Sequence, residues 1–142
     1  MAAQVSYDDV EVGTELPGQS LPVRRGDLVR YAGASGDFNV IHWNERVARS
    51  VGLPDVIAHG MFTMAVAVRV VTDWVGDPGA VVDYGVRFTR PVPVPDDDTG
   101  SAVEVAGTVA AVLEDKRVRV DLKATYNGAT VLGRAQAVVA LA

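Results

Sequence analysis

The sequence predicts an α+β fold in which an antiparallel β-sheet wraps around one long central helix. Two observations predict it. The first is a segment, residues 60–75, that is apolar on nearly all sides and therefore belongs inside a core. The second is the C-terminal half, whose pattern indicates successive strands with one apolar face. That face needs a cover, and the central helix is the segment with enough apolar surface to supply it.

The N-terminal half is expected to contain a loop and two shorter helices. Residues 7–22 contain Gly13, Pro17, Gly18 and Pro22, so we expect an entry loop. Leu21 and Val23 could supply at most a short strand at its end. Residues 26–34 have apolar side chains at helical spacing. Residues 45–51 predict a second helix, with Asn44 as its N-cap and Gly52 just past its end.

The remaining elements are the central helix and four strand segments. Residues 60–75 hold several β-branched side chains that would suit a strand, but the length of the segment favours a helix. Residues 81–91 alternate and then run into prolines, which indicates an edge or crossover segment. Residues 102–113 and 117–125 have alternating apolar side chains, and an Asn-Gly turn precedes the last strand, residues 131–141. The inner face of such a sheet is too large for one helix to close, so we expect a dimer.

Composition limits the classes of function. The chain has 142 residues, which suits one domain spanning residues 1–142. It has no cysteine, so disulfides and thiolate chemistry are excluded. The formal net charge of −5 argues against a nucleic-acid partner, because neutralising phosphates requires a basic surface.

The sequence gives no indication of a membrane or export signal. The N-terminal segment has acidic residues where a signal peptide has a basic run. The longest apolar run, residues 61–71, is interrupted by Thr63 and Arg69 and is too short to cross a bilayer. We therefore expect a cytoplasmic protein that does not bind a membrane.

The candidate functional site is the segment YAGASGDFNVIH, residues 31–42, together with His59-Gly60-Met61 at the head of the central helix. The only two histidines of the chain lie in these motifs, and Asp37 stands five residues before His42. An acid and an imidazole on a glycine-containing turn beside a helix N-terminus can form a proton-transfer site next to an oxyanion site. In a purely structural interpretation, Asp37 and Asn39 cap neighbouring backbone groups and the histidine is a buried core residue.

These motifs resemble those of a known family. Residues 31–42 resemble the signature of the R-specific enoyl-CoA hydratases, or MaoC-like dehydratases, which have the hotdog fold. Residues 58–61 are similar to the start of that family's central helix, and residues 83–95 to the strand and the segment that follow it. The run 72–81 and the overall length resemble, more narrowly, the catalytic B subunits of actinobacterial (3R)-hydroxyacyl-ACP dehydratases of fatty-acid elongation. The resemblance covers nearly the whole chain.

The resemblance implies reversible dehydration of (3R)-3-hydroxyacyl thioesters to trans-2-enoyl thioesters, without a cofactor or a metal. It places Asp37 and His42 on the catalytic dyad, and the backbone N–H of Gly60 on the oxyanion donor for the thioester carbonyl. Two positions depart from the family pattern. Val40 stands where proline is usual, and Ala65 stands where some members have a serine that supports the dyad.

Further residues are expected to line the substrate site: Asn39, His59, Met61, Arg87 and Phe88. Met61 would form part of the wall of the acyl channel, or simply part of the core. Arg87 and the nearby Arg90 would contact the phosphates of CoA or the acidic helix of an acyl carrier protein (ACP), unless they are ordinary solvated arginines. His59 would be a scaffold at the start of the helix more than a catalyst.

Alternatives remain open at this stage. One is a non-catalytic subunit that binds the acyl thioester for an active partner, against which the presence of both Asp37 and His42 argues. A second is a metal-dependent hydrolase that uses Asp37, His42, His59 and Asp55, although this spacing is poor for zinc. A third is a hotdog thioesterase, which would carry its carboxylate on a different segment. The partner subunit is either a second copy or a different hotdog chain, and the thioester handle is CoA or ACP.

Overall fold

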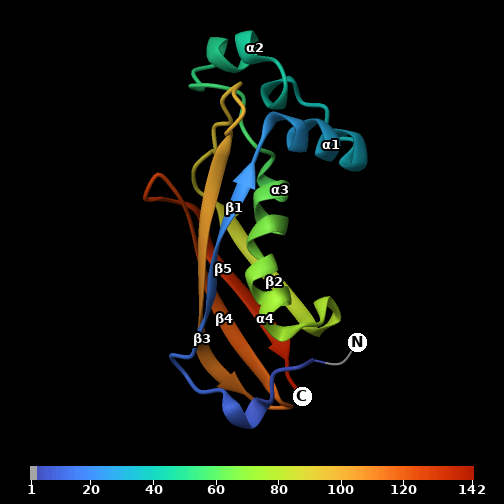
Figure 1. Cartoon of the computed structure of the whole chain (residues 1–142), viewed down its shortest axis with the longest axis vertical. Coiled ribbons are helices and arrows are strands. Elements are labelled where there is room, and N and C mark those ends of the chain that lie inside the picture. Colours follow the sequence, from blue (N-terminus) through green and yellow to red (C-terminus); the bar gives the residue numbers. More distant parts are fainter. Residues whose placement is uncertain (1–2) are drawn as a thin grey trace.

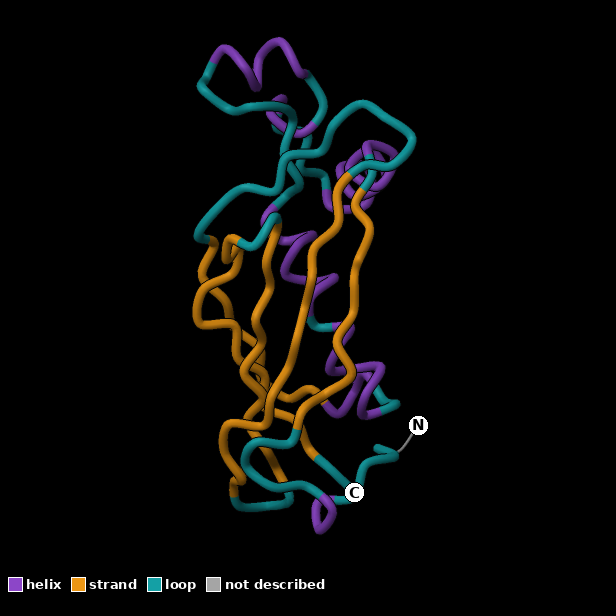
Figure 2. The backbone as a smooth tube through the Cα atoms, turned by 60° about the vertical axis from the view of Figure 1, so that its left-hand side comes forward, coloured by secondary structure: helices purple, strands orange, loops and turns teal. Residues whose placement is uncertain are grey.

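The computed structural model describes residues 3–142, so residues 1 and 2 of the predicted domain lie outside the described part. The strands are β1 (Glu15–Val23), β2 (Val81–Phe88), β3 (Ser101–Leu113), β4 (Arg117–Tyr126) and β5 (Ala129–Ala140). The helices are α1 (Arg25–Ser35), α2 (Glu45–Ser50), α3 (Gly60–Ala67) and α4 (Arg69–Val75), with 3₁₀ turns η1 (Tyr7–Asp9), η2 (Val40–His42) and η3 (Pro78–Ala80). The strands form one antiparallel sheet in the order β1-β3-β4-β5-β2, which curves around α3 and α4 (Figures 1 and 2). This confirms the predicted α+β class.

The predicted alternation of β4 is confirmed, because its inward side chains are buried. Val118, Val120 and Ala124 are fully buried and Leu122 is nearly so. The turn into β5 has positive φ at both central residues, 48° at Asn127 and 75° at Gly128. Residues that accept left-handed backbone angles are needed there, since this turn type matches the twist of the flanking strands.

The first strand is longer than the sequence predicted. Residues 15–23 form β1, where the glycines and prolines suggested a loop. β1 lies at the edge of the sheet, where a proline without an N–H does not remove a ladder hydrogen bond. The register with β3 shifts between Leu16 and Gln19, across Pro17 and Gly18, so an irregularity absorbs the two breaking residues.

The central helix is broken rather than continuous. α3 ends at Ala67 and α4 begins at Arg69, with Val68 between them at φ −68° and ψ −13°. The N–H of Val71 donates to the Val68 carbonyl at 2.9 Å, three residues away instead of four. The break falls in a run of β-branched side chains, whose restricted rotamers lower helix propensity. The prediction of one helix over residues 60–75 was therefore wrong on continuity and correct on type and extent.

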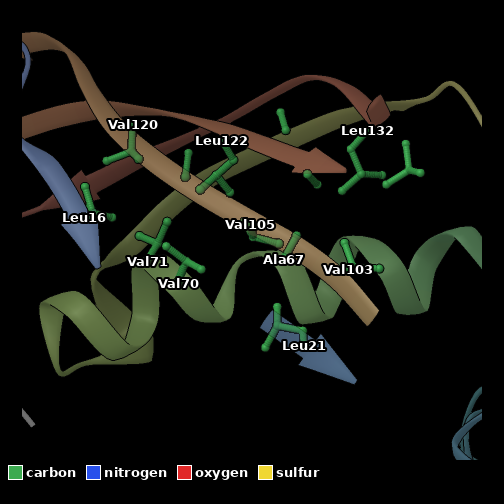
Figure 3. Close-up of a cluster of buried hydrophobic side chains, with 14 of the residues drawn as sticks. Leu16, Leu21, Ala67, Val70, Val71, Val103, Val105, Val120, Leu122 and Leu132 are labelled. Atoms are coloured by element: carbon green, nitrogen blue, oxygen red, sulfur yellow. The ribbon is translucent and has the colours of Figure 1, made fainter. Parts of the chain in front are cut away.

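The core lies between α3–α4 and the concave face of the sheet (Figure 3). From the helices, Ala67, Val70 and Val71 are at most 1% exposed, and they face Val105 and Val120 of the sheet. Full burial of a side chain of this size stabilises the fold by about 1.5–3 kcal/mol. Among residues 3–142, no helix combines the length and the apolar character needed to cross a membrane.

The segment between α1 and α3 lies over the N-terminal end of α3, at the top of Figure 1. The predicted α2 cap is confirmed, since the Asn44 side chain accepts the Val47 N–H at 3.1 Å. Arg25 at the start of α1 anchors this segment. Its guanidinium donates to the Val94 carbonyl at 2.6 Å and forms an ion pair with Asp55. These contacts tie the start of α1 to the loop that precedes α3 and to the segment between β2 and β3.

Candidate active site

The turn that carries Asp37 is held by its own side chains. α1 ends at Gly36, which has a φ of 77° that glycine adopts without strain. The Asp37 Oδ1 accepts the Asn39 N–H at 3.1 Å, and the Asn39 Oδ1 accepts the Ile41 N–H at 3.3 Å. Both side chains therefore act as caps, as in the structural interpretation of this motif. The second carboxylate oxygen of Asp37 takes no part in the cap and faces His42.

The hydrogen bonding of His42 decides which of its nitrogens can act as a base. Its Nδ1 lies 2.7 Å from the carbonyl oxygen of Ile57. A carbonyl only accepts, so Nδ1 carries the proton and Nε2 of the neutral ring carries the lone pair. This Nε2 lies 3.9 Å from the Oδ2 of Asp37, too far for a direct hydrogen bond. An oxygen atom about 2.8 Å from both atoms fits between them, with an angle of about 90° at that oxygen.

The two groups of the pair differ in exposure. The His42 side chain is 8% exposed and that of Asp37 is 51% exposed. Burial lowers the pKa of His42 below its ordinary value of 6.5, and this outweighs the hydrogen bond that His42 donates to the Ile57 carbonyl and the Asp37 charge, which raise it. A ring with a lowered pKa is neutral at pH 7, so His42 is available as a base.

A cavity of about 350 Å³ opens beside this pair. It is lined by the following residues: His42, Ile57, Ala58, Gly60, Thr63, Phe88, Thr89, Arg90, Pro91, Val92, Val131 and Leu132. Gly60 is the first residue of α3, and the first N–H groups of a helix have no partner within it. They also carry the positive end of the helix dipole, so this wall favours a developing negative charge. The cavity thus combines a base, an N–H donor and an apolar wall.

Gly60 also has a steric reason to be glycine. A Cβ built on it would lie 3.0 Å from Cδ1 of the Phe88 ring. Phe88 ends β2 and is 55% exposed, and its ring lies against the start of α3. The close approach of ring and backbone defines this wall.

The structure brings together some of the residues predicted for the site and separates others. His42, Gly60 and Phe88 line the cavity, with Asp37 facing His42. The other four occupy different positions: Asn39 caps the turn, His59 is buried beneath His42, Met61 is 56% exposed on α3, and Arg87 lines a separate hollow with Asp83 and Arg134. None of these four is among the lining residues of the cavity.

The sequence did not indicate several of the lining residues, among them Ile57, Thr63 and Leu132. Thr63 follows Gly60 by three residues, a helical spacing that could have indicated it; its hydroxyl donates to the His59 carbonyl at 3.4 Å. The Ile57 carbonyl and the side chain of Leu132 had no detectable signal, because only the folded chain brings a distant backbone group and β5 to this place.

The four-residue metal site of the hydrolase alternative is not assembled among the described residues. Asp37, His42 and His59 each offer a ligand atom within 4.8 Å of the others. Asp55 instead pairs with Arg25. The Nε2 of His59 lies 3.1 Å from the Asp37 carbonyl and carries a proton in that hydrogen bond, so only Nδ1 of this ring could ligate a metal.

A sheet wrapped around a central helix is a hotdog fold, and in this chain an acid–imidazole pair lies near the start of that helix. The model of the MaoC-like domain matches residues 9–127. A solved structure of a MaoC-like dehydratase superposes with a TM-score of 0.92 at 42% identity, over 96% of this chain and 42% of that one. The chain belongs to the MaoC-like domain family.

Two relatives illustrate the range of that family. The chain is 40% identical to 3-hydroxyacyl-thioester dehydratase X of Mycobacterium tuberculosis over 79 residues, which are 56% of this chain and 27% of the relative. It is 30% identical to the (R)-specific enoyl-CoA hydratase of Rhodospirillum rubrum over 112 residues, 78% of this chain and 74% of the relative. The chain thus spans about a quarter of the first protein and most of the second.

Proposed function

We propose that the chain is a hydro-lyase that reversibly dehydrates (3R)-3-hydroxyacyl thioesters to trans-2-enoyl thioesters. The observation that carries the proposal is the pairing of the His42 Nε2 lone pair with the Asp37 Oδ2, 3.9 Å apart, beside a cavity that also contains the first residue of α3. Membership of the MaoC-like family supports this reaction class, and both relatives carry dehydratase or hydratase names. We place the activity in the cytoplasm.

In the hydration direction, one water molecule lies between Asp37 and His42 and donates a hydrogen bond to each. The water oxygen bonds to C3 of the enoyl thioester while His42 Nε2 takes one of its protons. The electron pair of the C2–C3 double bond moves toward the thioester carbonyl. His42 then returns the proton to C2, so that water is added across the bond and both side chains regain their starting states. General acid–base groups of this kind contribute about 10²- to 10⁴-fold each.

In the dehydration direction the same steps run backwards. His42 removes the C2 proton, and Asp37 holds the 3-hydroxyl that leaves with that proton as water. The C2–H bond is acidic only if the carbonyl oxygen can take up negative charge. We assign that task to the Gly60 N–H at the start of α3, where loss of one such donor typically costs about 3–4 kcal/mol of barrier.

The acyl group is proposed to occupy the apolar part of the cavity, against Phe88, Val131 and Leu132. The handle is CoA or ACP, and Arg90 at the cavity wall and Arg87 on β2 supply positive charge for its phosphate groups. We further propose that Asn39 and Met61, together with the two arginines, contact the outer part of the substrate.

We also propose that the active unit contains a second hotdog subunit, either another copy or a different chain. β2 is an edge strand of the sheet, and Val82 and Phe88 on it are 53% and 55% exposed. Edge strands with exposed apolar side chains are normally covered.

The test is the hydration of trans-2-butenoyl-CoA and trans-2-octenoyl-CoA by the purified chain, followed as loss of the enoyl absorbance. The expected result is a (3R)-3-hydroxyacyl-CoA product, with turnover reduced at least 100-fold in a folded His42→Gln variant. The same acyl groups on ACP, with and without a candidate partner subunit, complete the series. A well-folded chain that hydrates neither form under any of these conditions contradicts the proposal, as does turnover that survives in His42→Gln.

A further inference from the structure

His59 lies beneath the Asp37–His42 pair and outside the cavity. Its side chain is 1% exposed. Its ring stacks on that of His42, with centroids 3.8 Å apart and planes inclined by 22°. Its Nε2 lies 3.1 Å from the backbone carbonyl oxygen of Asp37. One buried side chain therefore contacts both members of the pair, through atoms that take no part in the proposed proton transfers.

The hydrogen bond to Asp37 determines the protonation of His59. The carbonyl can only accept, so Nε2 carries the proton and Nδ1 of the neutral ring carries a lone pair. No hydrogen-bond partner within residues 3–142 reaches this Nδ1, which is buried. A buried acceptor without a donor destabilises a fold. A residue that only filled this space could be phenylalanine, which has a similar ring and no such acceptor, so packing alone does not account for histidine here.

The surroundings of the two rings restrict their motion. The Tyr31 ring from α1 packs against the His59 ring with centroids 4.8 Å apart, on a helix that leads directly into the Asp37 turn. Among the described residues, Tyr31 contacts the His59 ring, Asp37 faces His42, and Arg90 lines the same cavity as His42. The His59 ring is thus in contact with Tyr31 of α1, the Asp37 carbonyl and the His42 ring.

We propose that His59 is a positioning residue for the dyad, a role that rests on the proposed function. Its Nε2–H holds the main chain of Asp37, and its ring holds the plane of His42, so that Oδ2 and Nε2 face one common point. Misplacement of a reacting group by about 1 Å can cost about 100-fold in rate, so a contact that fixes both groups has a large effect on turnover. The neighbouring ring also adds to the lowering of the His42 pKa, after burial, which is the larger cause.

Two matched variants separate the hydrogen bond from the ring. His59→Phe keeps an aromatic ring against His42 and removes both the Nε2–H donor and the unpartnered Nδ1. We expect an unchanged or higher thermal midpoint, a kcat lower by about 10- to 100-fold and a KM within about twofold. His59→Gln keeps a donor for the Asp37 carbonyl, and we expect it to retain more of kcat than His59→Phe. In both variants the acid limb of the pH–rate profile moves to higher pH, because the neighbour that lowers the His42 pKa is gone.

A readout that does not need turnover completes the experiment. The chain has two histidines, so ¹⁵N spectra of the imidazole rings give two assignable sets of resonances. We expect the ring proton that bonds the Asp37 carbonyl to be found on the Nε2 of His59, and in His59→Phe a single histidine that titrates at higher pH than His42 does in the wild type. If the wild type shows this tautomer but hydrates no enoyl thioester, the proposed function fails and the contact between His59 and Asp37 stands.

If the wild type is active and a folded His59→Phe keeps its kcat, or if His59 has the other tautomer, the inference is overturned. If His59→Phe does not fold, a folded His59→Gln with less than about 1% of wild-type kcat overturns it, and one with most of kcat and a shifted acid limb supports it.

Discussion

Replacing Asp37 by asparagine removes one negative charge from the site while keeping the shape of the side chain. An amide oxygen can still accept the Asn39 N–H that caps the turn at 3.1 Å. The side chain is half exposed, so loss of its charge changes the free energy of unfolding by no more than about 0.5 kcal/mol. An effect on turnover would therefore come from the site and not from the fold.

The size of that effect follows from the geometry. In the proposed reaction His42 becomes a cation 3.9 Å from the Asp37 carboxylate. Two unit charges about 4 Å apart attract by about 1 kcal/mol in water and about 4 kcal/mol at the dielectric typical of a protein surface. The variant also loses a charged acceptor for the reacting oxygen, a bond worth about 1.5–3 kcal/mol. The two effects overlap, so we take the lower part of their combined range, about 2.5–4 kcal/mol, and expect kcat/KM to fall by about 10²- to 10³-fold.

The assay is hydration of trans-2-butenoyl-CoA by Asp37→Asn, with thermal unfolding measured on the same samples. Asp8→Asn is the matched control, since Asp8 is an exposed carboxylate of the 3₁₀ turn η1, and the blue segment near residue 8 lies at the opposite end of the molecule from α2 (Figure 1). Asp37 raises the pKa of His42, so the residual activity of the variant should have its acid limb at lower pH than the wild type. A folded Asp37→Asn protein with kcat/KM within threefold of the wild type would refute the assigned role of this carboxylate.

Three further predictions concern the cavity wall, the pH dependence and the core. In Gly60→Ala the new Cβ would lie 3.0 Å from the Phe88 ring, so we expect kcat/KM to fall roughly tenfold and to recover in Gly60→Ala/Phe88→Leu; no recovery would mean that the methyl group acts on the backbone instead. Because burial lowers the His42 pKa, the acid limb of kcat/KM should lie below pH 6.5, and the stability gained by keeping this ring neutral should be full above pH 6.5 and lost as pH falls through the lowered value. A limb above pH 6.5 in the rate profile would contradict this. Val71→Ala, at a fully buried position, should lower the free energy of unfolding in urea by about 2 kcal/mol, and a loss below about 0.5 kcal/mol would show that the cavity collapses.

The elements that were predicted correctly are those set by neighbours in the chain. The alternation of β4 requires only that successive side chains point to opposite faces. The Asn127-Gly128 turn and the Asn44 cap likewise depend on a few adjacent residues. The extent of β1 was wrong because an edge position tolerates prolines, and strand order is a property of the whole sheet.

For the candidate site, the sequence by itself determined which groups are present and how they are spaced. Asp37 and His42 lie on one capped turn, and Gly60 begins a helix, and short-range hydrogen bonds and backbone geometry account for all three. The motifs also led to the family, which the comparisons confirm.

Only the tertiary structure decided what these groups can do. The carbonyl of Ile57 selects the tautomer of His42, although Ile57 is fifteen residues away in the chain. Burial lowers the pKa of His42, and the groups that bury it come together only in the folded chain. The same holds for His59, which was expected to contact substrate and instead lies beneath the pair, and for Leu132, which reaches the cavity from β5. Protonation and burial depend on groups within a few ångströms, whatever their distance along the chain, so they are determined only when the sheet closes around the helix.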